Sequence, residues 1–269
     1  MDAELASWLP VTVSTLVLLA VAAFGAGWID AVVGGGGLIQ LPALVIGLPQ
    51  NLPSPYVLGT NKLAAFMGTF SASLVYLRRL RTQLIVILPL VIGAYSGSTG
   101  GAWLSRFLPR EILTPVVLVA VVGIGVYILF KPRLGITHEP RHDGSAMGWR
   151  AGVIGLCVGF YDGLLGPGTG SFFVILMVAM LGFGFLEASV NAKIANVVTN
   201  IAAIVLYGLH GEVVWALGLI MGTANILGAV IGARMAVRRG SEFVRKIFVV
   251  AISILALKLA WDTVDMFWL

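Results

Sequence analysis

Hydrophobic residues in this chain fall in ten runs, separated by short polar or glycine-rich segments. The runs are Val11–Val33, Leu38–Leu48, Tyr56–Leu77, Leu84–Leu104, Ile112–Phe130, Ala151–Leu165, Ser171–Leu186, Ala188–Leu209, Val213–Ala233 and Phe243–Trp261. A helix needs roughly 20 residues to cross a bilayer, and most runs have about this length. The second run of each half is shorter and follows a glycine cluster, which is typical of a broken or re-entrant helix. The pattern predicts an all-α, polytopic integral membrane protein with about eight to ten membrane segments.

Composition supports a bilayer environment. Hydrophobic residues make up 59% of the 269 residues and charged residues 11%, whereas a soluble domain has about 25% charged residues. Because so few charges cannot cover a soluble surface of this size, a soluble dinucleotide-binding fold of alternating strands and helices is excluded. The net charge of +5 lies mostly in short loops. We interpret it as a topology signal, with membrane lipid as the surroundings and no nucleic-acid partner.

The two halves of the chain repeat one another. The matched segments are Gly27–Gly34 with Gly159–Gly166, at an offset of 132, and Thr60–Ala64 with Asn191–Ala195, at an offset of 131. Matching glycines alone would be weak evidence in a chain with 34 glycines. An aspartate and a lysine at matching positions of apolar runs are stronger evidence, because both are rare there.

Positive charge in the loops predicts the orientation of the halves. The loop after the third run, Arg78–Arg81, is basic, whereas its counterpart in the second half, His210–Glu212, has no Lys or Arg. After the fourth run the richer loop is in the second half, Arg234–Lys246, although Arg106 and Arg110 lie at the matching place in the first. Since basic loops stay in the cytoplasm, the two repeats are expected to be inverted.

A single long polar segment separates the repeats. We therefore predict a first membrane repeat over residues 1–131, a cytoplasmic linker over 132–149 and a second repeat over 150–269. With five segments in each half, both termini would lie outside the inner membrane of a bacterial-type cell. If the short runs re-enter, the inversion rests on the loop charges alone.

The glycine clusters Gly34–Gly37 and Gly166–Gly170 are candidate helix breaks. In transporters with inverted repeats, such breaks meet near the middle of the bilayer and form the binding site. Free N–H groups and the positive dipole end of the following helix favour an anion there. The predicted substrate contacts near the breaks are Gly35, Gly36, Gly37, Gln40, Gly168, Thr169, Gly170 and Ser171. The alternative is a pair of loops that only allow tight helix packing.

Two lysines within apolar runs are the second signal. A lysine at the centre of a membrane helix costs roughly 2.5–3.5 kcal/mol to insert, so Lys62 and Lys193 are expected to face the interior and have partners. Further predicted contacts on the same runs are Thr60, Asn61, Asn196 and Asn200. The alternative is an ion pair within each half, Asp30 with Lys62 and Asp162 with Lys193. Contact of a lysine with the substrate and an ion pair with an aspartate are compatible, because a paired lysine can exchange its partner for an anion. Either aspartate could also bind a coupling proton or cation.

These motifs together resemble the TauE/SafE family of sulfite-exporter-like membrane permeases, and within it the YfcA-like branch. The resemblance covers about Val17–Asp262 and rests on Gly27–Asp30, Gly34–Gly37, Gly59–Lys62, Gly159–Gly163, Gly166–Phe173, Lys193, Asn196 and Asn200. It implies transport of small, mostly sulfur-containing anions such as sulfite, thiosulfate or an organosulfonate. Thr169 departs from the pattern, in which alanine is expected, and the change could alter selectivity.

We therefore expect a secondary transporter that moves a small anion by alternating access around a site between the repeats. A passive anion channel is the alternative, because channels also contain inverted repeats. An intramembrane aspartyl protease would need a Gly-x-Gly-Asp sequence, which is absent, so no enzyme is predicted. The three histidines and the single Cys157 form no metal set, and no cofactor is expected. A homodimer stays open.

Overall fold

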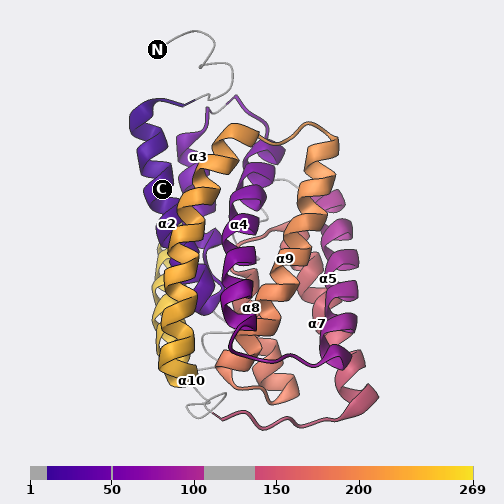
Figure 1. Ribbon diagram of the computed structural model, residues 1–269. Helices are drawn as coiled ribbons and strands as arrows, with labels where there is room; N and C mark the ends of the chain where they lie inside the picture. The colour runs from indigo at the N-terminus through magenta and orange to yellow at the C-terminus, as the bar shows by residue number, and fades with distance from the viewer. Residues whose placement is uncertain (1–10, 50, 106–136, 269) are drawn as a thin grey trace.

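The computed structural model describes residues 11–49, 51–105 and 137–268, and every regular element in these ranges is a helix (Figure 1). The first half contains α2 (Val13–Val33), α3 (Gly37–Gly47), α4 (Ser54–Leu77) and α5 (Leu84–Ser105). The second half contains α7 (Gly144–Leu164), α8 (Thr169–Leu176) with the short π-helix η1 (Met177–Leu181), α9 (Phe185–Leu209) and α10 (Trp215–Trp268). α10 is two helices joined at a kink at Gly240. The fifth expected run, Ile112–Phe130, lies outside the described residues, as do Arg106 and Arg110.

The distribution of side chains is the reverse of that in a soluble protein. Leu18 and Leu209 are 69% and 82% exposed, whereas Lys62 and Lys193 are 4% and 1% exposed. Among the described residues, four helices are long and apolar enough to cross a membrane: Val13–Val33, Leu84–Ser105, Phe185–Leu209 and Trp215–Val250. Lipid tails can cover the exposed apolar surface, and the charges lie inside the helix bundle. The predicted all-α, polytopic membrane protein is confirmed.

The short helices α3 and α8 turn back along the helices that precede them. Gly47, at the end of α3, lies against Leu19 near the start of α2. In the second half, the backbone N–H of Arg141, just before α7, donates to the carbonyl of Leu181 at the end of η1 (3.0 Å). The 11 residues of α3 make a helix of roughly 16 Å, too short for a hydrocarbon core of about 30 Å. The second run of each half therefore forms the short arm of a helical hairpin, α3 in the first half and α8 with η1 in the second.

The two halves run in opposite directions and interlock. In Figure 1, α2 and α4 descend from the top while α7 and α9 rise from the bottom. α5 packs along α7 of the other half, and α10 packs along α2. A Cβ at Gly97 of α5 would lie 2.2 Å from the carbonyl oxygen of Leu156, and one at Gly228 of α10 would lie 1.9 Å from that of Phe24. These contacts join matching positions of the two repeats. Each half therefore packs against the hairpin of the other, and the halves are inverted as predicted.

The basic loops gather at one end of the bundle. The α4–α5 loop, the segment before α7 and the kink of α10 lie together at the bottom of Figure 1. The N–H of Glu139 donates to the carbonyl of Gly182 (2.9 Å), and that of Leu186 donates to the Ser241 hydroxyl (3.1 Å). Since α7 begins at Gly144, the end of the segment interpreted as a linker is helical. Which end of the bundle faces the cytoplasm stays a prediction.

Candidate functional site

The tips of the two hairpins touch. The Ser171 N–H donates to the Gly34 carbonyl (3.2 Å), and the Ser171 hydroxyl donates to the Val33 carbonyl (2.9 Å). Gly34 has a φ of 85°, a conformation that side chains disfavour. A Cβ on Gly34 would also lie 2.2 Å from the carbonyl carbon of Gly170. The first glycine cluster thus makes a sharp turn and a close contact between the halves.

Helices α3 and α8 both begin at this contact. A Cβ on Gly37, the first residue of α3, would lie 3.5 Å from the Cα of Pro167, just before α8. A helix N-terminus carries a partial positive charge of about half a unit and unpaired N–H groups. Two such ends brought together make a local positive potential without any charged side chain.

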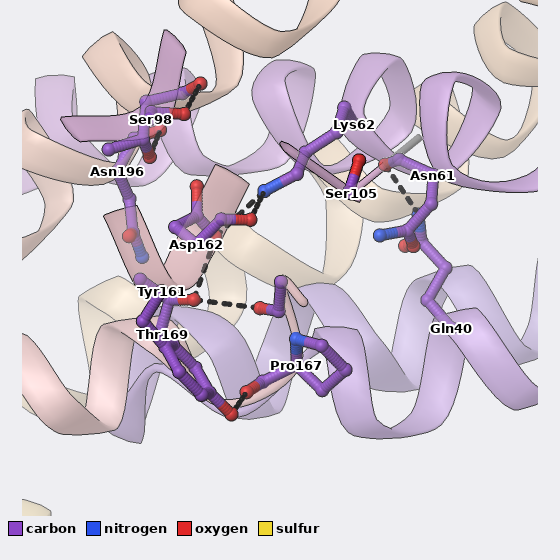
Figure 2. Close-up of polar contacts among 12 residues, drawn as sticks. Gln40, Asn61, Lys62, Ser98, Ser105, Tyr161, Asp162, Pro167, Thr169 and Asn196 are labelled. Atoms are coloured by element: carbon purple, nitrogen blue, oxygen red, sulfur yellow. Dashed lines mark hydrogen bonds and ion pairs between the residues drawn. The ribbon is translucent and has the colours of Figure 1, made fainter. Parts of the chain in front are cut away.

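Each buried lysine bonds the aspartate of the other half. Lys62 Nζ lies 2.7 Å from Asp162 Oδ1 and donates to the Asp162 carbonyl at 3.1 Å (Figure 2). Lys193 Nζ lies 2.9 Å from Asp30 Oδ2 and also donates to the Asp30 carbonyl. The alternative of an ion pair within each half, Asp30 with Lys62 and Asp162 with Lys193, is therefore wrong. The tips of the two hairpins meet between α4 and α9, so each lysine reaches the aspartate near the tip of the other half's hairpin and the partners are exchanged.

The lysines also complement two helix ends. Asp30 and Asp162 lie in the last turns of α2 and α7, where the helix dipole is negative. One ammonium group at each end binds both a carbonyl and a carboxylate. Desolvating a buried ion costs several kcal/mol, and these paired contacts offset that cost.

A small cavity lies between the hairpin tips and the helices that carry the ion pairs. Its empty volume is about 340 Å³, counting space that opens to solvent. The predicted site residues that line it are Asp30, Gly37, Asn61, Lys62, Asp162, Gly168, Thr169, Gly170, Asn196 and Asn200. Gly34, Ala65, Thr69 and Gly166 complete the lining. Residues from both halves, far apart in sequence, thus meet around one space.

The other predicted site residues lie close by and make structural contacts. Gly35 and Gly36 form the turn before α3, Ser171 joins the tips, and Lys193 lies behind Asp30. The Thr60 hydroxyl accepts from the N–H of Val214 (3.0 Å), just before α10. In the described ranges, no three His, Cys, Asp or Glu residues are placed to hold a metal ion.

A chain of side-chain amides fixes the first hairpin. Asn225 of α10 donates from Nδ2 to Gln40 Oε1 (2.6 Å), and Gln40 Nε2 donates to the carbonyl of Asn61 (3.2 Å; Figure 2). Asn225 is 3% exposed and was not among the predicted residues. Its only signal in the sequence is an amide inside the apolar run Val213–Ala233. Gln40 therefore supports Asn61 from behind rather than lining the cavity.

Threonine hydroxyls bond both aspartates, yet some cavity oxygens have no partner. Thr69 Oγ1 lies 3.1 Å from Asp30 Oδ2, and Thr169 Oγ1 lies 2.7 Å from Asp162 Oδ1. Within the described part of the chain, the buried atoms without a hydrogen-bond partner include Asn61 Oδ1, Asn196 Oδ1 and Asp162 Oδ2. If the side-chain amide of either asparagine is rotated, its N–H group takes the place of the unpaired oxygen. The ionised carboxylate of Asp162 has no N–H group to place there.

Comparison with known proteins agrees with the geometry. The profile of the family described as sulfite exporter TauE/SafE matches residues 19–259. The probable membrane transporter protein ORF9 of Sinorhizobium sp is 36% identical over 92% of this chain and 93% of its own length. The probable membrane transporter protein YfcA of Escherichia coli K12 is 35% identical over 88% of this chain and 87% of its own length. No solved structure matches significantly. The chain therefore belongs to the TauE/SafE family of membrane transporters.

Proposed function

We propose that this membrane transporter carries a small anion, which binds in the cavity between the hairpin tips. The observation that supports an anion is the convergence of the α3 and α8 N-termini on a cavity that Lys62 also lines. Helix N-termini bind anions through free N–H groups and the dipole. A site for an organic cation would need the opposite helix polarity.

The side chains around the cavity suit an oxyanion. Asn61, Asn196 and Asn200 offer uncharged amides on helices α4 and α9, and amide N–H groups can reach several oxygens of one small ion. Sulfite, thiosulfate and an organosulfonate all carry such oxygens on one centre. The cavity chemistry supports an oxyanion in general, and the family description as a sulfite exporter supports a sulfur-containing one.

Alternating access is the mechanism that we propose for the inverted repeats. The tip contact at Ser171 and the two crossed ion pairs join the halves on either side of the cavity. Rocking of one half against the other would open the tip contact toward one membrane face at a time, as in other inverted-repeat transporters. By the positive-inside rule, the basic end of the bundle faces the cytoplasm of a bacterial-type cell and both termini lie outside the inner membrane.

Binding to purified protein in detergent tests the site. Isothermal titration with sulfite, thiosulfate and methanesulfonate should reveal a saturable site. Asn196→Ala and Asn200→Ala each remove an amide facing the anion and should weaken binding by about 10- to 100-fold. The matched control is Asn191→Ala, on the same helix, because Asn191 is buried but donates to the Glu187 carbonyl (2.8 Å). Wild-type affinity in both cavity variants would show that the anion binds elsewhere.

Transport in proteoliposomes separates a carrier from a channel. A carrier should show saturable uptake of the bound anion, accelerated by the same anion on the other side. Ohmic single-channel currents would contradict alternating access and favour a passive anion channel.

A further inference from the structure

Charges around the cavity balance within the protein. Lys62 is matched by Asp162 at 2.7 Å and Lys193 by Asp30 at 2.9 Å. All four charges belong to residues that line the cavity or bond a lining residue. A bound anion would therefore add an uncompensated negative charge to a buried site, which is unfavourable. The helix N-termini offset part of that cost, and a cation taken up with the anion would offset the rest.

The two carboxylates differ in exposure and in which oxygens are hydrogen-bonded. At Asp30, Lys193 and Thr69 both bond Oδ2, and the side chain is 17% exposed. At Asp162, Lys62 and Thr169 both bond Oδ1, and the side chain is only 5% exposed. Asp162 Oδ2 is buried and, in the described chain, without a hydrogen-bond partner.

Protonation of Asp162 Oδ2 would neutralise an unpaired buried oxygen and break no hydrogen bond, although it also removes the negative charge that faces Lys62. An ionised oxygen without a donor in a buried place costs free energy. A proton on Oδ2 removes that charge and turns an unpaired acceptor into a donor that faces the cavity. The bonds to Oδ1 from Lys62 and Thr169 stay in place.

Among the described residues around Asp162, the other titratable groups already have partners. Lys62 of α4 already bonds it, and Asp30 of α2, across the cavity, is held by Lys193 of α9. The hydroxyl of Tyr161, its neighbour in sequence, donates to the Pro167 carbonyl (2.9 Å). α8 contributes Thr169, and α5, which packs along α7, has no charged residue between Leu84 and Ser105.

We propose that Asp162 takes up one proton on Oδ2 when the anion binds, so that the transporter moves anion and proton together. This rests on the anion transport proposed above. The proton comes from solvent, one O–H bond forms, and the proton cancels the charge of a monovalent anion or one of the two charges of thiosulfate. Neutral Asp162 leaves the Lys62 ammonium unmatched, and its charge then faces the anion. Asp30 keeps Lys193 in place through the cycle.

The test is the pH dependence of anion binding. Thiosulfate and methanesulfonate are the probes, because their charges stay constant from about pH 6 to 9, whereas sulfite titrates in this range. If one proton is bound with the anion, anion binding to the wild type should weaken as pH rises, and the Kd should increase by up to about tenfold per pH unit. A pH indicator in weak buffer should register uptake of about one proton per anion bound.

Two isosteric variants assign the proton. Asp162→Asn carries an N–H donor where the protonated acid would carry O–H, so its Kd should be the same across the range and no proton should be taken up. Asp30→Asn should keep the pH dependence of Kd that the wild type shows. If either variant fails to fold, proton uptake by the wild-type protein still tests the coupling.

The outcomes separate this inference from the function on which it rests. Absence of binding for every probe would overturn anion transport, and the proton role with it. Binding with a constant Kd and no proton uptake would leave the anion site standing and overturn the role of Asp162. If the pH dependence of Kd is lost in Asp30→Asn but kept in Asp162→Asn, the proton binds Asp30 and the proposal for Asp162 is overturned. Binding that requires Na⁺ and takes up no proton would also overturn it.

Discussion

The two crossed ion pairs are related by the inverted repeat, yet their surroundings differ. Each lysine bonds both a carboxylate and a backbone carbonyl of the other half. The Asp162 side chain, however, is 5% exposed and that of Asp30 is 17% exposed. The repeat therefore preserves the charges and the helix ends that they complement, while the environment of each carboxylate has diverged. We interpret the Asp30 pair as structural and the Asp162 pair as the one that responds to the anion.

Neighbouring residues diverge in the same direction. Asn196 and Thr169 line the cavity from the second half, where the first half has Ala65 and Gly37 at matching positions. The second hairpin also contains the π-helix η1, where α3 is a regular helix, and such irregular turns are frequent at functional sites. The first hairpin is instead fixed by the amide chain from Asn225. Each half thus contributes four polar side chains to the cavity, but the amide chain holds the first hairpin and the irregular helix lies in the second.

The largest effect is expected from breaking a crossed pair. Lys62→Met leaves Asp162 buried without its counter-ion and should lower the free energy of unfolding by about 3–5 kcal/mol. Adding Asp162→Asn should recover much of this loss, because the unpaired charge is then gone. Denaturant unfolding followed by tryptophan fluorescence in detergent measures both variants.

Two further variants serve as controls for this double-mutant cycle. Adding Asp30→Asn to Lys62→Met should deepen the loss, since it breaks the second pair. The exposed pair Lys246–Glu242, at 2.8 Å, should be removable with little change. If the cycle shows an interaction energy between Lys62 and Asp30 instead of Asp162, the ion pairs form within each half, which contradicts the structure.

A smaller difference is expected between the two glycine turns. Gly34 and Gly166 have φ values of 85° and 83°, so alanine at either costs about 1–2 kcal/mol in backbone strain. A Cβ at Gly166 meets nothing closer than Lys62 Nζ at 3.5 Å, whereas one at Gly34 lies 2.2 Å from the backbone of Gly170. Gly34→Ala should therefore separate the tips and destabilise the protein more than Gly166→Ala.

Thermal unfolding and thiosulfate binding measure the difference between these turns. Gly25→Ala is the matched control in α2, because its Cβ meets nothing within 4 Å and alanine favours a helix. Equal losses for Gly34→Ala and Gly166→Ala would mean that the tip contact adds nothing beyond the strained turn.

The smallest effect is expected from the threonines that bond the aspartates. Thr169→Ala removes the 2.7 Å hydrogen bond to Asp162 and should cost about 1 kcal/mol of stability. Thr69→Ala removes the 3.1 Å bond to Asp30 and should cost less, because water reaches the more exposed carboxylate. Thermal unfolding ranks the two. An equal or reversed order would argue against the difference in solvation between the two pairs.

Much of the fold could be predicted because it depends on local patterns. Apolar runs of spanning length, glycine clusters before short runs, and basic loops at alternate places are each visible in a few neighbouring residues. The candidate site followed from the same source, since charged residues within apolar runs are costly and rare. The roles of Thr60 and Gln40 were less accessible, because a polar residue near a helix break can equally face the cavity or support a neighbouring helix.

By itself, the sequence determined that two inverted repeats place two aspartates, two lysines and two glycine breaks inside a membrane bundle. It could not determine which aspartate each lysine binds, because the repeat offers every lysine two equivalent partners. Only the tertiary structure decided this, by packing α5 on α7 and α10 on α2, so that the hairpin tips meet and each lysine reaches the aspartate of the other half. The same packing decided that Asp162 Oδ2 lies buried beside the cavity without a partner among the described residues, because solvation depends on neighbours that are distant in sequence.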